Sequence, residues 1–490
     1  MKRQTGILLA VSSLPGNQGI GDFGKQAYRF LDILAKHQMK IWQILPLHPL
    51  GYGNSPYQPY STFAGDPIYI NIDHLADLEL LKQSSIRNFN KFCDRVDYEG
   101  VRAFKEPYLR KAFRVFKKSF HEYEASYQVF CEECDWLHTF AVFAALKKKN
   151  KNAAWLEWDK EERLWIQDPT RPLPYLREEI EYEKFLQFMF YMQWNDIVAY
   201  ANERGIQIMG DMPIYVGLDS VDVWENQSYF LLDKNGYPTA VAGVPPDYFS
   251  AEGQRWGNPL YNWKRMKKDN YHFWIRRLQW AKQHFNYTRI DHFRGFDTYW
   301  KIPARCVTAI EGEWEEGPAY DFFDTIYEAL PDIQIVAEDL GDLRKEVGQL
   351  RDYYHLLGMR VLQFEMEPKR LKHGLSEHVI VYTGTHDNMT LEQWYEAQKQ
   401  NKKIALRRFF HNRAYNERNF HDLVIHFALD SKAVVCIIPM QDILGLKEEG
   451  RMNTPSTIGS PNWEWKLKNF KEVTVEMDKI TQWSKTSNRI

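Results

Sequence analysis

Eight short apolar runs, spread along the whole chain, limit the folds that this sequence can adopt. They lie at 6–11, 40–47, 206–211, 288–292, 333–339, 359–364, 378–384 and 433–440. Most are continuously apolar rather than alternating, which is typical of parallel strands buried on both faces. The pattern therefore predicts an α/β fold of the (β/α)₈ (TIM) barrel type. A doubly wound open sheet is the alternative, but no glycine-rich phosphate-binding motif follows an early run.

Helix-like stretches lie between several of these runs, for example at 22–38 and 270–285. In the second stretch Phe273, Ile275, Leu278 and Ala281 lie near one helical face, as in an amphipathic helix that packs on a sheet.

Two gaps between the runs are too long to be simple crossovers. Residues 48–205 contain charged sequence with helical periodicity, which predicts an inserted, mainly helical subdomain between the second and third strands. Residues 212–287 are aromatic and loop-like, and we expect them to form an inserted loop region that contributes to a substrate cleft. No flexible linker separates these parts, so the sequence predicts one catalytic barrel over 1–490.

Charge and cysteine content exclude several classes of partner. The chain has 63 basic and 65 acidic side chains, so it lacks the basic surface that nucleic acid or an anionic membrane attracts. The apolar stretch 7–11 is shorter than the roughly 7–15 residues of a signal peptide core. No run approaches the roughly 20 residues of a membrane helix.

Cys131 and Cys134 form a CxxC pair without a second pair. We therefore predict a cytoplasmic protein that binds no metal, no nucleic acid and no membrane.

Polar residues at the ends of the predicted strands suggest where chemistry takes place, because barrel active sites lie at the carboxyl ends of the strands. They are Asp211, Arg289, Asp291, His292, Arg294, Glu338, Asp339, His386, Asp387 and Asn388. A single acid after a strand is more often a helix cap. Acids at four strand ends, two of them beside histidine, favour a catalytic role.

Several carboxylates with arginine, histidine and aromatic residues suit the cleavage of a glycosidic bond, in which one carboxylate acts as nucleophile and a protonated carboxyl group as acid. Asp291 lies two residues from Arg289, which favours its ionised form and the role of nucleophile. Glu338 is then the general acid/base. Asp387, oriented with His386, is the stabiliser of the transition state. Spacing alone does not fix the order of these roles.

Long and unusual strings make the chain resemble one known family. They are GILLAVSSLPG, GYGNSPYQPYSTFAGDP, GDMPIYV, GVPPDYFSAEGQRWGNPLY, RIDHFRG, VAEDLG, YTGTHDN and RMNTPS. The chain resembles glycoside hydrolase family 77, the 4-α-glucanotransferases (amylomaltases or disproportionating enzymes), which are related to the α-amylases. The resemblance implies no cofactor, no calcium ion and no C-terminal β-sandwich. One departure is Ser456, where the family pattern has glycine.

The resemblance also implies roles for individual residues. The catalytic residues are Asp291, Glu338 and Asp387. Around the attacked sugar it places Tyr57, Asp211, Arg289, His292 and His386, with Asn388 beside them. Asp247, Tyr248, Phe249, Gln254 and Trp256 match a mobile loop at the acceptor site. From the residues alone, an ordinary aromatic surface loop is the preferred interpretation of this segment.

The predicted function is therefore a retaining 4-α-glucanotransferase. It would move a segment of an α-1,4-glucan to the 4-hydroxyl of an acceptor glucan or glucose, with maltooligosaccharides and amylose as substrates. The alternatives are an α-amylase-type hydrolase, which uses the same three carboxyl groups, and a non-catalytic glucan-binding protein. The oligomeric state is not predicted.

Overall fold

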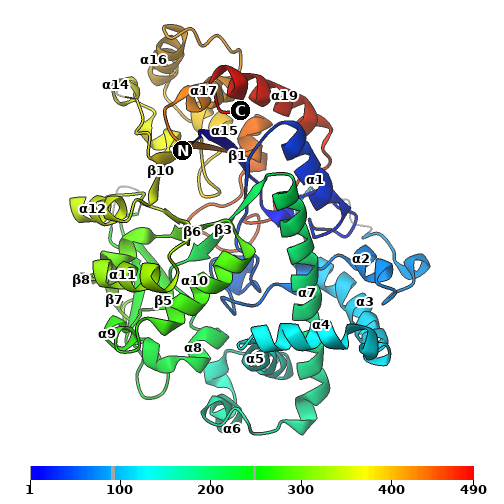
Figure 1. Ribbon diagram of the computed structural model, residues 1–490. Coiled ribbons are helices and arrows are strands. Elements are labelled where there is room, and N and C mark those ends of the chain that lie inside the picture. Colours follow the sequence, from blue (N-terminus) through cyan, green and yellow to red (C-terminus); the bar gives the residue numbers. More distant parts are fainter. Residues whose placement is uncertain (1, 90–93, 247–249, 373) are drawn as a thin grey trace.

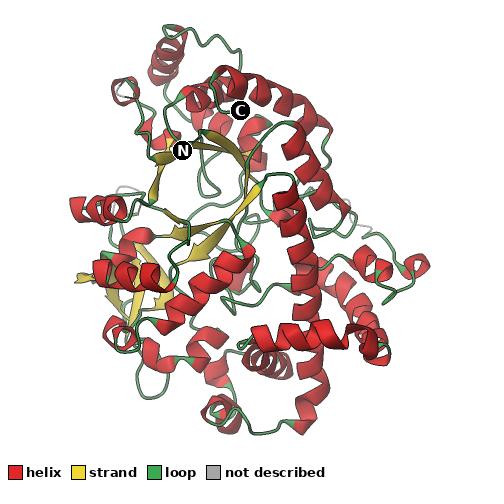
Figure 2. Ribbon diagram, in the orientation of Figure 1, coloured by secondary structure: helices red, strands yellow, loops and turns green. Residues whose placement is uncertain are grey.

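The computed structural model describes residues 2–89, 94–246, 250–372 and 374–490, and its centre is a closed barrel of eight parallel strands (Figures 1 and 2). The barrel strands are β1 (Gln4–Leu8), β2 (Ile41–Gln43), β3 (Gln207–Pro213), β6 (Tyr287–Asp291), β9 (Ile335–Ala337), β10 (Leu357–Val361), β11 (Val379–Tyr382) and β12 (Val435–Pro439). They pair in this order, and β12 closes on β1. Each overlaps one of the eight apolar runs, so the predicted (β/α)₈ barrel is confirmed.

The barrel strands are buried almost without interruption, which explains why their sequences do not alternate. Every residue of β12 is buried, and β3 is exposed in part only at its first residue. Inside the barrel the Tyr382 hydroxyl donates to Gln43 Oε1 at 2.9 Å, so this buried polar pair is satisfied.

Amphipathic helices surround the barrel. The longer ones are α1 (Lys25–Lys36), α7 (Arg177–Glu203), α10 (His272–His284), α11 (Ala319–Ala329), α12 (Lys345–Tyr353), α16 (Gln400–His411), α17 (Phe420–Asp430) and α19 (Lys471–Thr486). On α10, Phe273, Leu278 and Ala281 are buried as predicted, whereas Ile275 is only half-buried. Trp274 and Arg277 are buried as well. The apolar pattern does not predict the burial of Arg277. Its guanidinium donates a hydrogen bond to the carbonyl oxygen of Pro213 at 2.7 Å, which lowers the cost of burying this charge.

Between β2 and β3 the chain forms a group of helices beside the barrel (Figure 1). They are α2 (Ile72–Asp77), α3 (Tyr98–Lys118), α4 (Phe120–Glu133), α5 (Leu137–Lys149), α6 (Lys160–Arg163) and then α7. Phe116 of α3 contacts Phe120, Tyr127 and Phe185, so aromatic rings form much of the core of this region. α7 joins it to the barrel, because it packs on α3 and α5 and also on α1 and β3.

A second sheet of four antiparallel strands lies next to the barrel, in the order β5-β4-β7-β8 (Figure 2). Its strands are β4 (Ala240–Val244), β5 (Gln254–Pro259), β7 (Thr298–Pro303) and β8 (Glu313–Glu316). Residues 212–287, expected to be loop-like, thus contain two strands, α8 (Val221–Glu225), α9 (Trp263–Lys267) and α10. β4 pairs with the next strand, β5, and also with β7, about sixty residues later, and no local sequence pattern contains the second pairing.

The remaining elements complete the second half of the barrel. α13 (Leu362–Glu365) and α14 (Pro368–Leu371) follow β10, α15 (Leu391–Glu396) follows β11, and α18 (Met440–Ile443) follows β12. After β12 the described residues hold helices and turns but no strand, in agreement with the absence of a β-sandwich. Ser456, which stands where the family pattern has glycine, has a φ of 66°, in the left-handed region that favours glycine. Among the helices of the described ranges, none combines the length and apolar character needed to cross a bilayer.

Candidate active site

The register of β3 and β6 brings two of the predicted residues together. Asp211 lies opposite Arg289, and Pro213 lies opposite Asp291. Arg289 Nη1 donates to both carboxylate oxygens of Asp211, at 2.7 and 2.8 Å. Its Nη2 forms an ion pair with Asp291 Oδ1 at 3.1 Å. One buried guanidinium therefore holds two strand-end carboxylates, and the fully buried Asp211 balances its charge.

Tyr57 reaches this group from the segment that follows β2. Its hydroxyl donates to Asp211 Oδ2 at 2.8 Å and lies 3.5 Å from His386 Nδ1. The Tyr57 ring also stacks on the His386 ring, with centroids 5.1 Å apart and planes 17° from parallel. Burial and the Asp211 charge raise the pKa of Tyr57, so its hydroxyl stays a donor. The structure thus joins the predicted residues of the second, third, fourth and seventh strands.

Glu338 follows β9 and is fixed by backbone groups. The His292 backbone N–H donates to Glu338 Oε2 at 2.7 Å, and the Leu340 N–H donates to Oε1 at 3.0 Å. His292 has a φ of 56°, and this left-handed turn follows Asp291 directly. The carboxyl group of Glu338 is therefore bound to the turn that follows Asp291.

Asp339, the neighbour of Glu338, points elsewhere and has a different role. It is buried, forms ion pairs with Arg351 and with Arg360 at 3.4 Å, and accepts the Met359 N–H at 2.7 Å. Successive side chains of an extended segment point to opposite faces, which explains why two adjacent acids separate in this way.

The electrostatic surroundings distinguish Glu338 from Asp291. Burial, followed by the neighbouring charge of Asp291, raises the pKa of Glu338 to about 7, against the opposing effect of Arg289. Burial also raises the pKa of Asp291, and the Arg289 guanidinium again opposes the rise. Of these two carboxyl groups, only that of Asp291 forms an ion pair with Arg289 among the salt bridges of the described residues. Asp291 is therefore the better placed to be ionised while Glu338 keeps its proton.

Asp387 lies on the loop after β11, next to the predicted His386, and is also held by Asn453, which the sequence analysis did not select. Its Oδ1 accepts a hydrogen bond from Asn453 Nδ2 at 2.7 Å, and its Oδ2 lies 3.4 Å from His386 Nε2. Asn453 also donates its backbone N–H to the carbonyl oxygen of His386 at 3.1 Å. Trp463 contacts the rings of both Tyr57 and His386. In the sequence, the one sign that Asn453 belongs to the site was its place in the family-like string RMNTPS.

The other predicted substrate-binding residues divide into three groups. Trp256, on β5, meets the His292 ring edge-on at 4.8 Å, and its Nε1 donates to Gln254 Oε1 at 3.2 Å. Asn388 Oδ1 accepts hydrogen bonds from the backbone N–H and the hydroxyl of Thr385, so this oxygen stabilises the turn between the two residues. The third group, Asp247, Tyr248 and Phe249, lies outside the described residues.

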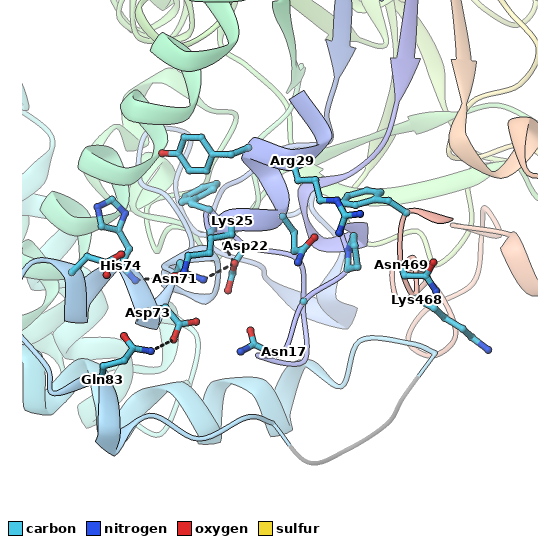
Figure 3. Close-up of a pocket in the computed structure, with 18 residues that line it drawn as sticks. Asn17, Asp22, Lys25, Arg29, Asn71, Asp73, His74, Gln83, Lys468 and Asn469 are labelled. Carbon is cyan, nitrogen blue, oxygen red and sulfur yellow. Dashed lines mark hydrogen bonds between the residues drawn. The ribbon is translucent and has the colours of Figure 1, made fainter. Parts of the chain in front are cut away.

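A separate cavity of about 790 Å³ lies between the segment before α1, the helix α2 and the residues before α19 (Figure 3). Asp22 and Asn71 line it and hydrogen-bond to each other at 2.9 Å. Lys105 also pairs with Asp22, at 3.3 Å. Its lining includes none of the strand-end residues described above. Within the described ranges, no three His, Cys, Asp or Glu side chains are grouped as a metal site.

The fold is a closed (β/α)₈ barrel, and carboxyl groups held by an arginine and by backbone N–H groups lie at the ends of its strands, where the enzymes of this fold class have their active sites. More particularly, residues 9–472 match the sequence model of glycoside hydrolase family 77, described as 4-alpha-glucanotransferase, and the chain belongs to that family.

Individual relatives agree with this assignment. A 4-alpha-glucanotransferase of Thermus thermophilus is 42% identical over 488 residues, which cover 95% of each chain. A chloroplastic/amyloplastic 4-alpha-glucanotransferase of Solanum tuberosum is 40% identical over 484 residues, covering 95% of this chain and 82% of the relative. The solved structure of an amylomaltase from Streptococcus agalactiae in complex with acarbose superposes with a TM-score of 0.94, at 36% identity and with 100% of both chains covered. The family expected from the sequence strings is thus confirmed.

Proposed function

We propose that the protein is a retaining 4-α-glucanotransferase that acts on α-1,4-glucans. In the first step Asp291 attacks the anomeric carbon of a donor glucan, and the bond from that carbon to the departing O4 breaks. Glu338 gives its proton to this oxygen, so the reducing-end fragment leaves as an alcohol and a glycosyl ester of Asp291 remains. In the second step Glu338 takes the proton of an acceptor 4-hydroxyl, whose oxygen displaces Asp291 and restores an α-1,4 bond.

The observation that carries this proposal is the difference between the two carboxyl groups. Asp291 is paired with a buried guanidinium, whereas burial and the charge of Asp291 bring the pKa of Glu338 to about 7. Once Asp291 is esterified its charge is lost, and the pKa of Glu338 falls. The same group then becomes a base at the moment when the acceptor must be deprotonated.

The surrounding residues have supporting roles in this proposal. Arg289 and Asp211 hold Asp291 in position, and Tyr57 and His386 form a stacked wall beside them. Asp387, oriented by Asn453, binds sugar hydroxyls more tightly as the ring flattens toward the oxocarbenium ion. Support for a glucan substrate comes from relatives named as glucanotransferases and from the related amylomaltase bound to acarbose. The cytoplasmic location remains a prediction, since the Solanum tuberosum relative is named chloroplastic/amyloplastic.

The test is to incubate the protein with maltotriose alone and to separate the products by chain length. Glucose together with oligosaccharides longer than maltotriose, at constant total reducing ends, is the expected result. Glucose and maltose with rising reducing ends would make the protein a hydrolase instead. No reaction with maltotriose or with amylose would leave a glucan-binding protein.

A further inference from the structure

We propose that Trp314 forms an outer glucan-binding subsite on the side of the proposed active site where the leaving chain departs and the acceptor arrives. This inference rests on the proposed function, because it concerns how a long α-1,4-glucan is held beyond the reacting sugars. It starts from the exposure of Trp314. Of the 17 tryptophans, all within the described ranges, Trp314 is the most exposed, with 42% of its surface accessible to solvent.

The surroundings of Trp314 hold its ring in a fixed orientation. Trp314 lies directly opposite Trp300 in the pairing of β7 with β8, and the two rings are 5.1 Å apart. Trp300 is anchored by its Nε1, which donates to the carbonyl oxygen of Ala309 at 2.9 Å. The Arg294 guanidinium lies 4.0 Å from the centre of the Trp314 ring. A ring supported in this way loses little conformational freedom when a sugar stacks on its exposed surface.

The hairpin face that carries Trp314 is turned toward the two loops of the catalytic carboxyl groups. Strand residues two apart share a face, so Thr298 and Glu316 lie on the same face as Trp300 and Trp314. Thr298 Oγ1 accepts a hydrogen bond from Arg294 Nη2 at 3.3 Å, and Arg294 is the second residue after His292.

The same end of this face is also fixed to the loop after Glu338, because Glu316 lies opposite Thr298 in the pairing of β7 with β8. Glu316 forms an ion pair with Arg344 at 2.8 Å, and Arg294 Nη1 donates to the carbonyl oxygen of Asp342 at 2.6 Å. Trp314 thus sits above the junction of the loops that follow β6 and β9. Because Glu338 protonates the departing O4, a platform beside its loop meets the glucan on the leaving-group and acceptor side.

The occupant is a neutral sugar chain rather than a charged ligand. Flat sugar faces stack on tryptophan rings through C–H and dispersion contacts, and the indole brings a large apolar surface with few rotatable bonds. The hairpin lies between β6 and α11, and therefore at the carboxyl ends of the barrel strands, where the substrate is bound. A chain longer than the central subsites would reach this surface, whereas a short donor would not.

The test compares Trp314→Ala with the unaltered enzyme on maltotriose and on amylose. We expect kcat/KM for maltotriose to change less than twofold, and KM for amylose to rise about fivefold at unchanged kcat. Trp314→Phe should recover most of the loss. Tyr175→Ala is the matched control, since Tyr175 is a similarly exposed aromatic residue in the inserted helical region and should affect neither substrate.

A second measurement does not depend on turnover. In the Asp291→Asn background, Trp314→Ala should weaken binding of maltoheptaose by a similar factor in calorimetry and leave binding of maltose unchanged. Equal losses for short and long glucans, or no loss for either, would overturn the subsite. Absence of transfer by the unaltered enzyme would instead refute the proposed function.

Discussion

In the proposed mechanism Glu338 donates a proton to the departing O4, so raising the pH through 7 is expected to inactivate the enzyme by removing that proton. The rise of the Glu338 pKa from 4.5 to about 7 corresponds to about 3 kcal/mol of destabilisation of its ionised form. At pH 7 about half of the molecules then carry the proton, compared with about 0.3% for a carboxyl group of ordinary pKa. At pH 7 the protonated fraction of Glu338 is therefore about 150-fold larger than that of a carboxyl group of ordinary pKa.

The pH dependence of kcat/KM for maltotriose follows from these values. Above pH 7 the protonated fraction of Glu338 falls, so kcat/KM should decrease about tenfold per pH unit. On the acid side, kcat/KM should decrease as Asp291 is protonated, at a pH above the ordinary range because burial raises its pKa. The two limbs together give a bell-shaped profile whose apparent pKa values belong to the coupled pair.

The assay measures glucose release from maltotriose between about pH 4.5 and 9, a range that covers both limbs of the expected profile. Circular dichroism and recovery of activity at pH 6.5 exclude unfolding as the cause of the loss. α-Maltosyl fluoride serves as control donor, since fluoride leaves without a proton and the basic limb should disappear for glycosylation. A basic limb with a midpoint below about 5.5, or an unchanged limb with the fluoride, would refute this reasoning.

Three further changes test individual parts of the site. Asp291→Asn should reduce kcat by at least about a thousandfold with an unchanged circular dichroism spectrum; substantial residual transfer would place the nucleophile elsewhere. Asp211→Asn leaves the buried Arg289 with Asp291 as its remaining ion-pair partner, so urea unfolding should show a loss of about 3 kcal/mol. A loss below about 1 kcal/mol would mean that Asp291 alone satisfies the guanidinium. Asn453→Ala removes a hydrogen bond to Asp387 and should lower kcat/KM about tenfold without changing stability appreciably; unchanged kinetics would show that Asp387 needs no such support.

Some features of the protein could be predicted from the sequence because their physical causes are local. The eight strands are continuously apolar, and burial on both faces of a parallel barrel requires that composition wherever the strand lies. The acids at the strand ends could be identified for the same reason, since each lies at the end of an apolar run or within three residues after it. The barrel and its strand-end carboxyl groups were therefore determined by the sequence itself.

The remaining features depend on contacts between distant segments. Glu338 and Asp339 are adjacent acids, and only the direction of each side chain decides that one binds the turn after Asp291 while the other pairs with Arg351. Asn453 approaches Asp387 from 66 residues away, and Trp314 is exposed while the other tryptophans are covered at least in part. The pKa of about 7 at Glu338 likewise arises from burial and a charge on another strand. Pairing across the chain, desolvation and side-chain direction are properties of the assembled structure, so only the tertiary fold could decide them.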